Sequence, residues 1–258
     1  MSSITFEIKD KIAFITLNRP EKLNSFNREM ALTLQNRLDE SAGLHEVRAV
    51  LLTGAGRAFS AGQDLAEITG PNAIGMDKIL SEQYNPIVTR IRNLPKPVIA
   101  AVNGVAAGAG ANIALCCDIV VATRSANFVQ AFSKIGLIPD SGGTWFLPRL
   151  VGWQKAMGIA MLGDKISAAE GERMGMVYKV YDDEEFAGAS RALAAVLAQM
   201  PTRALAYTKH AFNYSATNSL EAQLLLEDEL QQKAALTQDH AEGVNAFIDK
   251  RAPLFKGE

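Results

Sequence analysis

A single carboxylate, Asp140, lies between a proline and a pair of glycines in the segment 135–144 (IGLIPDSGGT). An acid on a rigid bend is a candidate for proton transfer, because a general acid or base must be held in one position. About thirty residues earlier, the glycine-rich segment 103–112 (NGVAAGAGAN) leads into a predicted helix, where backbone N–H groups can bind a negative oxygen. Together the two segments indicate chemistry on a carbonyl compound, in which Asp140 moves the proton and the turn binds the oxyanion.

A second turn of this kind follows the strand predicted at 48–53. Gly62 allows the backbone to turn sharply there, so the N–H of Gln63 can point into a cleft. An enolate-like oxygen needs a pair of such donors, and the loss of one typically costs roughly 3–4 kcal/mol. The alternative is that the two glycine-rich turns only allow a helix to pack closely against a strand.

Helix capping offers a competing role for the acidic residues. Asp64 is predicted to be the N-cap of the short helix that follows it, which is a structural role. Asp140 or Ser141 could cap a helix that starts near Gly142. The sequence leaves capping and catalysis by Asp140 about equally open.

The composition excludes several classes of function. The chain has 258 residues, 48% hydrophobic and 21% charged, with a net charge of −2, which predicts a globular protein without a nucleic-acid or membrane partner. The N-terminal residues do not resemble a secretory signal, and the longest weakly polar run is interrupted by glycines, so we expect a cytoplasmic protein. The adjacent Cys116 and Cys117 cannot form an ordinary disulfide and are expected to be buried thiols.

Other catalytic machinery is not predicted. The histidines are His45, His210 and His240, and none lies in the segment that carries the two turns. The sequence contains no dinucleotide-binding fingerprint, no Walker-type phosphate loop and no cluster of metal ligands. We therefore expect proton transfer without a metal or redox cofactor.

The elements that must position these residues alternate between strands and helices, which predicts an α/β protein built from stacked ββα units. Asn27 is the expected cap of one helix, and from Asp183 onward only helical patterns remain. Strands are expected at 4–8, 12–17, 48–53, 98–102 and 118–122, and helices at 28–42, after 76, and at 109–117, 185–199, 202–214, 219–235 and 239–248.

The sequence resembles the crotonase, or enoyl-CoA hydratase/isomerase, superfamily along nearly its whole length. The resemblance implies a crotonase-type spiral of ββα repeats and acyl-CoA thioester substrates, so that coenzyme A is part of the substrate. It also implies that residues 1–195 form the core carrying the CoA-ester site, and that residues 196–258 form a helical region for contacts in a homotrimer or a dimer of trimers. The motifs that carry it are 17–25 (LNRPEKLNS), 59–64 (FSAGQD), 95–110, 117–118 (CD), 138–143 (IPDSGG) and 163–167 (GDKIS).

Matched by position, the resemblance implies that the backbone N–H groups of Gln63 and Ala109 form the oxyanion hole. It also places the backbone around Ala61 against the adenine of coenzyme A. Two glutamates of the family's hydratases match Asn112 and Phe132, neither of which can act as an acid or a base, so hydration of a 2-enoyl-CoA is not expected. The substrate-binding residues predicted in these segments are Ala61, Gly62, Asp64, Leu65, Gly108, Gly110 and Phe132.

Three neighbouring residues have open roles. Phe132 could be an apolar pocket wall that raises the pKa of Asp140, or it could only fill space. Asn112 could form a hydrogen bond near the site, although we favour the interpretation that it only satisfies its own helix. Trp145 is interpreted as a packing residue.

The segment 131–145 (AFSKIGLIPDSGGTW) looks most like the ring-epoxide isomerase subgroup of phenylacetate degradation. That resemblance implies a cofactor-free isomerase that converts 2-(1,2-epoxy-1,2-dihydrophenyl)acetyl-CoA to oxepin-CoA, with Asp140 as the acid or base. One alternative is a general Δ3,Δ2-enoyl-CoA isomerase of fatty-acid oxidation. The other is a non-catalytic member that binds CoA esters.

Overall fold

The larger of two sheets forms the centre of the fold in this computed structural model, which describes residues 2–69 and 73–258. Its strand order is β1-β2-β3-β5-β7-β10, and every pair except the β1–β2 hairpin is parallel. Asp10 and Lys11 have positive φ angles of 50° and 66°, which suits a two-residue hairpin turn. The strands are β1 (Ile4–Lys9), β2 (Ile12–Leu17), β3 (Ala49–Gly54), β5 (Val98–Val102), β7 (Ile119–Thr123) and β10 (Lys179–Tyr181).

The smaller sheet consists of short strands in the order β4-β6-β8-β9. Strands β4, β6 and β8 each follow a strand of the larger sheet, and they pair in parallel just as β3, β5 and β7 do. Successive ββα units therefore stack into a spiral, as the sequence predicts. These strands are β4 (Ala58–Ser60), β6 (Val105–Ala107), β8 (Asn127–Val129) and β9 (Lys165–Ser167).

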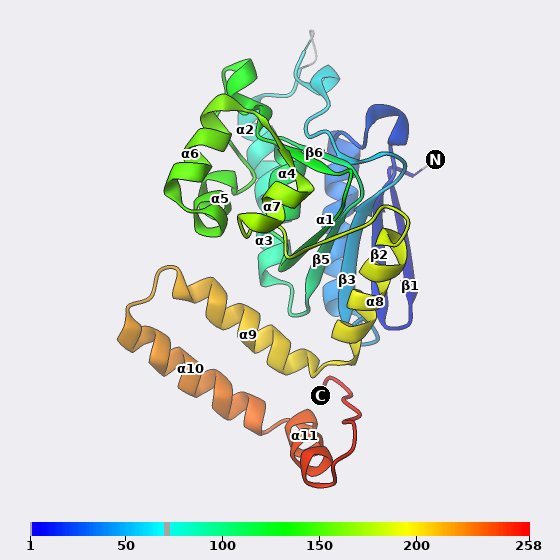
Figure 1. Cartoon of the computed structure of the whole chain (residues 1–258), viewed down its shortest axis with the longest axis vertical. Helices are drawn as coiled ribbons and strands as arrows, with labels where there is room; N and C mark the ends of the chain where they lie inside the picture. The colour runs from blue at the N-terminus through cyan, green and yellow to red at the C-terminus, as the bar shows by residue number, and fades with distance from the viewer. Residues whose placement is uncertain (1, 70–72) are drawn as a thin grey trace.

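Helices cover both faces of the larger sheet (Figure 1). Side chains alternate along a strand, so Leu52 of β3 packs in the cluster that includes Leu34 of α1, whereas Leu51 packs with Phe186 of α8. Asn27 caps α1 as predicted, because its side chain accepts a hydrogen bond of 2.9 Å from the Met30 amide. The helices of this part are α1 (Arg28–Gly43), α2 (Met76–Lys78), α3 (Asn85–Asn93), α4 (Ala109–Leu115), α5 (Gly143–Val151), α6 (Trp153–Leu162), α7 (Ala168–Arg173) and α8 (Phe186–Gln199).

The C-terminal region is helical, with α9 (Thr202–Ser215), α10 (Leu220–Ala235) and α11 (Gln238–Ile248) extending away from the sheets (Figure 1). The predicted boundary between residues 195 and 196 falls inside α8, a helix that packs on the sheet. None of the described helices is long and apolar enough to cross a membrane.

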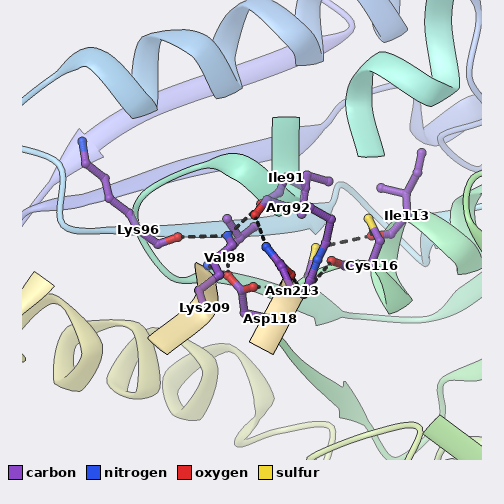
Figure 2. A network of polar contacts seen from close by, with 10 residues as sticks. Ile91, Arg92, Lys96, Val98, Ile113, Cys116, Asp118, Lys209 and Asn213 are labelled. Carbon is purple, nitrogen blue, oxygen red and sulfur yellow. Dashed lines mark hydrogen bonds and ion pairs between the residues drawn. The ribbon is translucent and has the colours of Figure 1, made fainter. Parts of the chain in front are cut away.

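A partly buried polar network joins α9 to the core (Figure 2). Lys209 of α9 donates through Nζ to Asp118 Oδ2 at 2.7 Å, and Asp118 Oδ2 also accepts from the Val98 amide at 2.8 Å. Asn213 and Arg92 exchange hydrogen bonds beside this pair. The Cys116 and Cys117 thiols nearby are free and buried, as expected.

Candidate active site

A cavity of about 420 Å³ lies where the turn after β4, the start of α4 and the segment before α5 meet. It contains nine of the ten site residues predicted from the sequence. Gly110 does not line the cavity and faces Ser60 of β4 instead. A Cβ at this position would lie 2.6 Å from Ser60, so the glycine allows α4 to pack against β4. The predicted residues that line the cavity are Ala61, Gly62, Gln63, Asp64, Leu65, Gly108, Ala109, Phe132 and Asp140.

The backbone N–H groups of Gln63 and Ala109 at this cavity are unpaired within the described part of the chain. Phe26 forms a bridge with the turn, in which its amide donates to Gly62 O at 2.6 Å and its carbonyl accepts from Asp64 N at 2.8 Å. The N–H of Gln63, between these two bonds, has no acceptor among the described residues, nor has the N–H of Ala109 at the first position of α4. Two free donors lining one cavity can bind a developing oxyanion.

Gly62 brings the two donors together. Its φ angle is +88°, and a Cβ there would lie 2.8 Å from Ala107 O and 3.4 Å from Ala109 N. The peptide that carries the Gln63 N–H therefore passes directly beside the amide of Ala109. Gly108, with a φ angle of +52°, turns the chain into α4 on the other side.

Asp140 is partly buried at the same cavity. Burial raises the pKa of its carboxyl group, and the hydrogen bond that it accepts from Ser141 Oγ at 2.8 Å only partly offsets this effect. No lysine or arginine forms a salt bridge with it in the part of the chain that the structure describes. A carboxylate with a raised pKa is a stronger base than an exposed one, which suits proton abstraction.

The capping alternative for Asp140 and Ser141 is wrong. Helix α5 begins at Gly143, its N-cap is Gly142, and no side chain caps it. Ser141 and Gly142 instead have φ angles of +50° and +78°, so the bend before the helix is held in a left-handed conformation.

Asn112 holds this bend in place. The residue is fully buried, its Nδ2 donates to the carbonyl oxygen of Asp140 at 2.8 Å, and its Oδ1 accepts from Gln130 Nε2 at 2.7 Å. The favoured interpretation, that Asn112 only satisfies its own helix, is therefore wrong. Asn112 is therefore an anchor for the turn that carries Asp140.

The remaining predictions concern single side chains. Phe132 is buried and lines the cavity, with its ring 3.8 Å from where a Cβ of Gly108 would lie. Asp64 caps the turn Leu65–Glu67 as expected by accepting from Ala66 N at 3.1 Å. Burial raises the Asp64 pKa, but hydrogen bonds from Arg19 and Ala66 outweigh it, so the net pKa is lowered. Trp145 does not line the cavity and instead packs under the guanidinium of Arg149.

Sequence reasoning missed one wall of the cavity. Met76, Ile79 and Tyr84 line it from the helical segment before α3. The sequence predicts a helix after Met76 but no role for its residues. The signal that could have identified the site is a lone tyrosine in the polar stretch 81–86 (SEQYNP).

Comparison with known proteins assigns the chain to a family. Residues 7–258 match the family described as Enoyl-CoA hydratase/isomerase. The chain belongs to the enoyl-CoA hydratase/isomerase family. This finding confirms the resemblance seen in the sequence.

Individual members resemble the chain over its full length. It is 50% identical to the 1,2-epoxyphenylacetyl-CoA isomerase of Escherichia coli K12, over 100% of both chains. It is 33% identical to the trans-2-decenoyl-[acyl-carrier-protein] isomerase of Streptococcus mutans, over 99% and 98% of the two chains. The crystal structure of an enoyl-CoA hydratase from Bacillus anthracis superposes with a TM-score of 0.92 at 32% identity, covering 99% of this chain and all of the other. The crotonase-type fold is therefore confirmed.

Proposed function

We propose that this protein is an isomerase of acyl-CoA thioesters that converts 2-(1,2-epoxy-1,2-dihydrophenyl)acetyl-CoA to oxepin-CoA in phenylacetate catabolism. One observation carries the proposal: Asp140 lines the same cavity as the unpaired N–H groups of Gln63 and Ala109. The identity of the acyl group is supported by the 50% identity to a 1,2-epoxyphenylacetyl-CoA isomerase.

The thioester oxygen would accept hydrogen bonds from Gln63 N and Ala109 N, which stabilise the negative charge that develops on it. Asp140 would remove a proton from the substrate and return it elsewhere, and its burial makes the carboxylate a better base. Asn112 and Phe132 carry no acid or base, which disfavours the addition of water. Isomerisation leaves the composition and oxidation level of the substrate unchanged, so the proposal requires no net oxidant or reductant. The two backbone N–H groups, rather than a metal, would stabilise the oxyanion.

The substrate-binding roles of the other residues belong to the same proposal. Ala61, Gly62, Asp64 and Leu65 would meet the coenzyme A moiety along the turn after β4. Gly108 and Phe132 would border the acyl group, and the Phe132 ring would keep water from Asp140.

We test the proposal by comparing the native protein with Asp140→Asn on the aromatic epoxide thioester and on an aliphatic 3-enoyl-CoA. Positioned proton transfer contributes roughly 10²–10⁴ in rate, so activity should fall at least a hundredfold in a folded variant. The exposed Asp164→Asn is the matched control and should keep full activity.

The results also separate the alternatives. Undiminished activity in Asp140→Asn would overturn the mechanism. A higher rate on the aliphatic ester than on the epoxide would favour the general Δ3,Δ2-enoyl-CoA isomerase. Tight binding of both esters by the native protein without turnover would favour the non-catalytic member.

Assembly as a homotrimer or a dimer of trimers in the cytoplasm is a further part of the proposal. Helices α9–α11 expose large apolar side chains that a neighbouring subunit would cover, including Phe212, Leu225 and Phe247, which are 71%, 73% and 85% exposed. Light scattering should give the mass of three or six chains, and the mass of a single chain would contradict this part.

A further inference from the structure

Tyr84 lies at the end of a π-helical turn that faces the candidate active site. The turn spans Ile79–Tyr84 and connects α2 to α3. In an α-helix, residues five positions apart would be separated by roughly 140° around the axis. The wider π-helical turn brings Ile79 and Tyr84 to one face, and both line the cavity. Turns of this kind occur frequently at functional sites.

The Tyr84 hydroxyl binds the side chain of Gln63. Its oxygen is 2.7 Å from Gln63 Oε1, to which it donates. On the other side, Gln63 Nε2 donates to Asp64 O at 3.3 Å and to Glu67 Oε2 at 3.4 Å. Glu67 is in turn fixed by the amide of Arg28, which is 2.8 Å and 2.9 Å from its two carboxyl oxygens. The Gln63 side chain is thus held at both its oxygen and its nitrogen.

We propose that Tyr84 is a positioning residue, whose hydroxyl holds Gln63 so that the unpaired Gln63 N–H stays directed at the thioester oxygen. The inference rests on the proposed function, because it assigns a role within the same oxyanion hole. A donor that binds developing charge must be oriented before the reaction, since reorientation during the reaction would cost free energy. The bridge to Phe26 fixes the backbone on both sides of the Gln63 N–H, and the hydrogen bond from Tyr84 adds a constraint on the Gln63 side chain.

The environment keeps the Tyr84 hydroxyl a donor. Burial raises the pKa of Tyr84 well above its usual value, and the charges of Asp140 and Glu67 raise it further. The phenol therefore stays protonated when Asp140 is ionised. Its ring also packs edge-to-face with Phe26 at 5.9 Å between centroids, so a phenylalanine at position 84 would keep the packing and lose only the hydrogen bond.

The test is a double-mutant cycle on turnover of whichever CoA ester the native protein isomerises. The variants are Tyr84→Phe, Gln63→Met and the double variant, with Tyr178→Phe, an exposed tyrosine outside the cavity, as the matched control. We expect kcat to fall about tenfold in Tyr84→Phe, the effect of losing one hydrogen bond, while KM changes less than about twofold. The double variant should be no slower than the slower single variant, because both changes remove one interaction.

A second readout measures the oxyanion hole without turnover. A 3-oxoacyl-CoA exists in equilibrium with its enolate, which absorbs in the near ultraviolet, and an oriented donor pair should increase the bound enolate fraction. Tyr84→Phe should bind this probe with a smaller enolate fraction than the native protein, and Tyr178→Phe should equal the native protein. If Tyr84 had only a structural role, a folded Tyr84→Phe variant would bind the probe with the same enolate fraction as the native protein.

The outcomes separate this inference from the proposed function. Failure of the native protein to isomerise any CoA ester would overturn the proposed function and this inference with it. Turnover by the native protein with an unchanged kcat in Tyr84→Phe, or additive effects in the double variant, would overturn the role of Tyr84 alone. If Tyr84→Phe does not fold, the Gln63→Met variant provides the test. A tenfold lower kcat at unchanged KM in this variant supports the positioning role of Tyr84, and an unchanged kcat overturns it.

Discussion

The side chain of Asn112 in α4 is hydrogen-bonded at 2.8 Å to the backbone carbonyl of Asp140. Ala109, which begins the same helix, carries one of the two unpaired N–H groups. Positions three apart lie on one side of a helix, so a single turn of α4 sets the spacing between the donor and the bend that carries the carboxylate. The geometry of the candidate site therefore depends on one short, buried helix.

Replacing Asn112 by alanine should weaken both the fold and the site. The change leaves the side-chain NH2 group of Gln130 buried without its partner, which costs roughly 1–3 kcal/mol. It also removes one of the two hydrogen bonds that the carbonyl oxygen of Asp140 accepts, leaving the one from Gly143 N at 2.7 Å. We expect a lower midpoint of thermal unfolding and at least tenfold lower activity, because the bend at Asp140 loses its anchor. Calorimetry and the isomerase assay measure the two effects.

The matched control is Asn85→Ala, at an exposed asparagine at the start of α3. This variant should unfold and turn over like the native protein. A fully active Asn112→Ala variant would show that the bend holds Asp140 without the side-chain hydrogen bond.

Asp140 should lower the stability of the protein at neutral pH. Burial raises its pKa in the folded state above the ordinary value of 3.8. Between the two pKa values the folded state binds more protons than the unfolded state, so the free energy of unfolding falls as pH rises through this range. Asp140→Asn removes the charge and should therefore unfold at a higher temperature than the native protein at neutral pH.

The advantage of Asp140→Asn should shrink as pH is lowered toward about 4, where the unfolded carboxyl also becomes protonated. Thermal unfolding of both proteins across this range measures the difference. A difference that does not change with pH, or a less stable variant at neutral pH, would contradict the assigned cause of the pKa shift.

Much of the fold could be predicted because the signals are local. The helix 28–42 was predicted from its Asn27 cap, and it ends one residue later, at Gly43. The predicted C-terminal helix 202–214 likewise agrees with α9 within one residue. The predicted helix 109–117 is two residues too long, because the backbone already leaves the helix at Cys116 and leads into β7.

The contacts around Asp140 could not be predicted because they join distant residues. The bond from Asn112 to Asp140 crosses 28 positions, and the bond from Tyr84 to Gln63 crosses 21. A sequence pattern reports neighbours along one element, whereas these pairs meet only after the spiral has stacked. The glycine motifs were informative because their signal is local. Gly62 and Gly108 have positive φ angles, which glycine adopts more readily than other residues.

The network at Asp118 predicts strong coupling between the core and α9. Asp118 and Lys209 form an ion pair (Figure 2). Their side chains are 17% and 8% exposed. Asp118→Ala would remove the countercharge of the Lys209 ammonium and leave it only the carbonyl oxygens of Ile91 and Lys96 as acceptors. Breaking a buried ion pair in this way costs up to about 3–5 kcal/mol. The double variant Asp118→Ala/Lys209→Met should be less destabilised than the sum of the two single variants.

Chemical denaturation of the four proteins measures this coupling. The control is the exposed ion pair between Arg124 and Asp182, whose side chains are 63% and 61% exposed, and Arg124→Ala should leave the unfolding midpoint nearly unchanged. Additive effects at Asp118 and Lys209 would mean that the two groups stabilise the protein independently.

Gly62→Ala should reduce activity more than any other conservative change in the turn after β4. A methyl group at this position would lie 2.8 Å from Ala107 O, and the φ angle of +88° is strained for alanine. Overpacking of this kind costs about 1–3 kcal/mol, and relief of the clash would move the peptide that carries the Gln63 N–H away from the Ala109 N–H. We therefore expect a lower unfolding midpoint and a kcat reduced roughly a hundredfold, as for loss of an oxyanion donor.

Gly188→Ala provides the matched comparison for this change. Gly188 lies in α8, and a Cβ there would meet no atom within 4 Å. Alanine is favoured over glycine inside a helix by roughly 0.5–1 kcal/mol, so this variant should be slightly more stable and fully active. Opposite shifts in the unfolding midpoints of the two Gly→Ala variants would show that the conformation of Gly62, and not the loss of a glycine as such, is what the site requires. A Gly62→Ala variant with native kcat would mean that the two N–H groups do not need the spacing that Gly62 imposes.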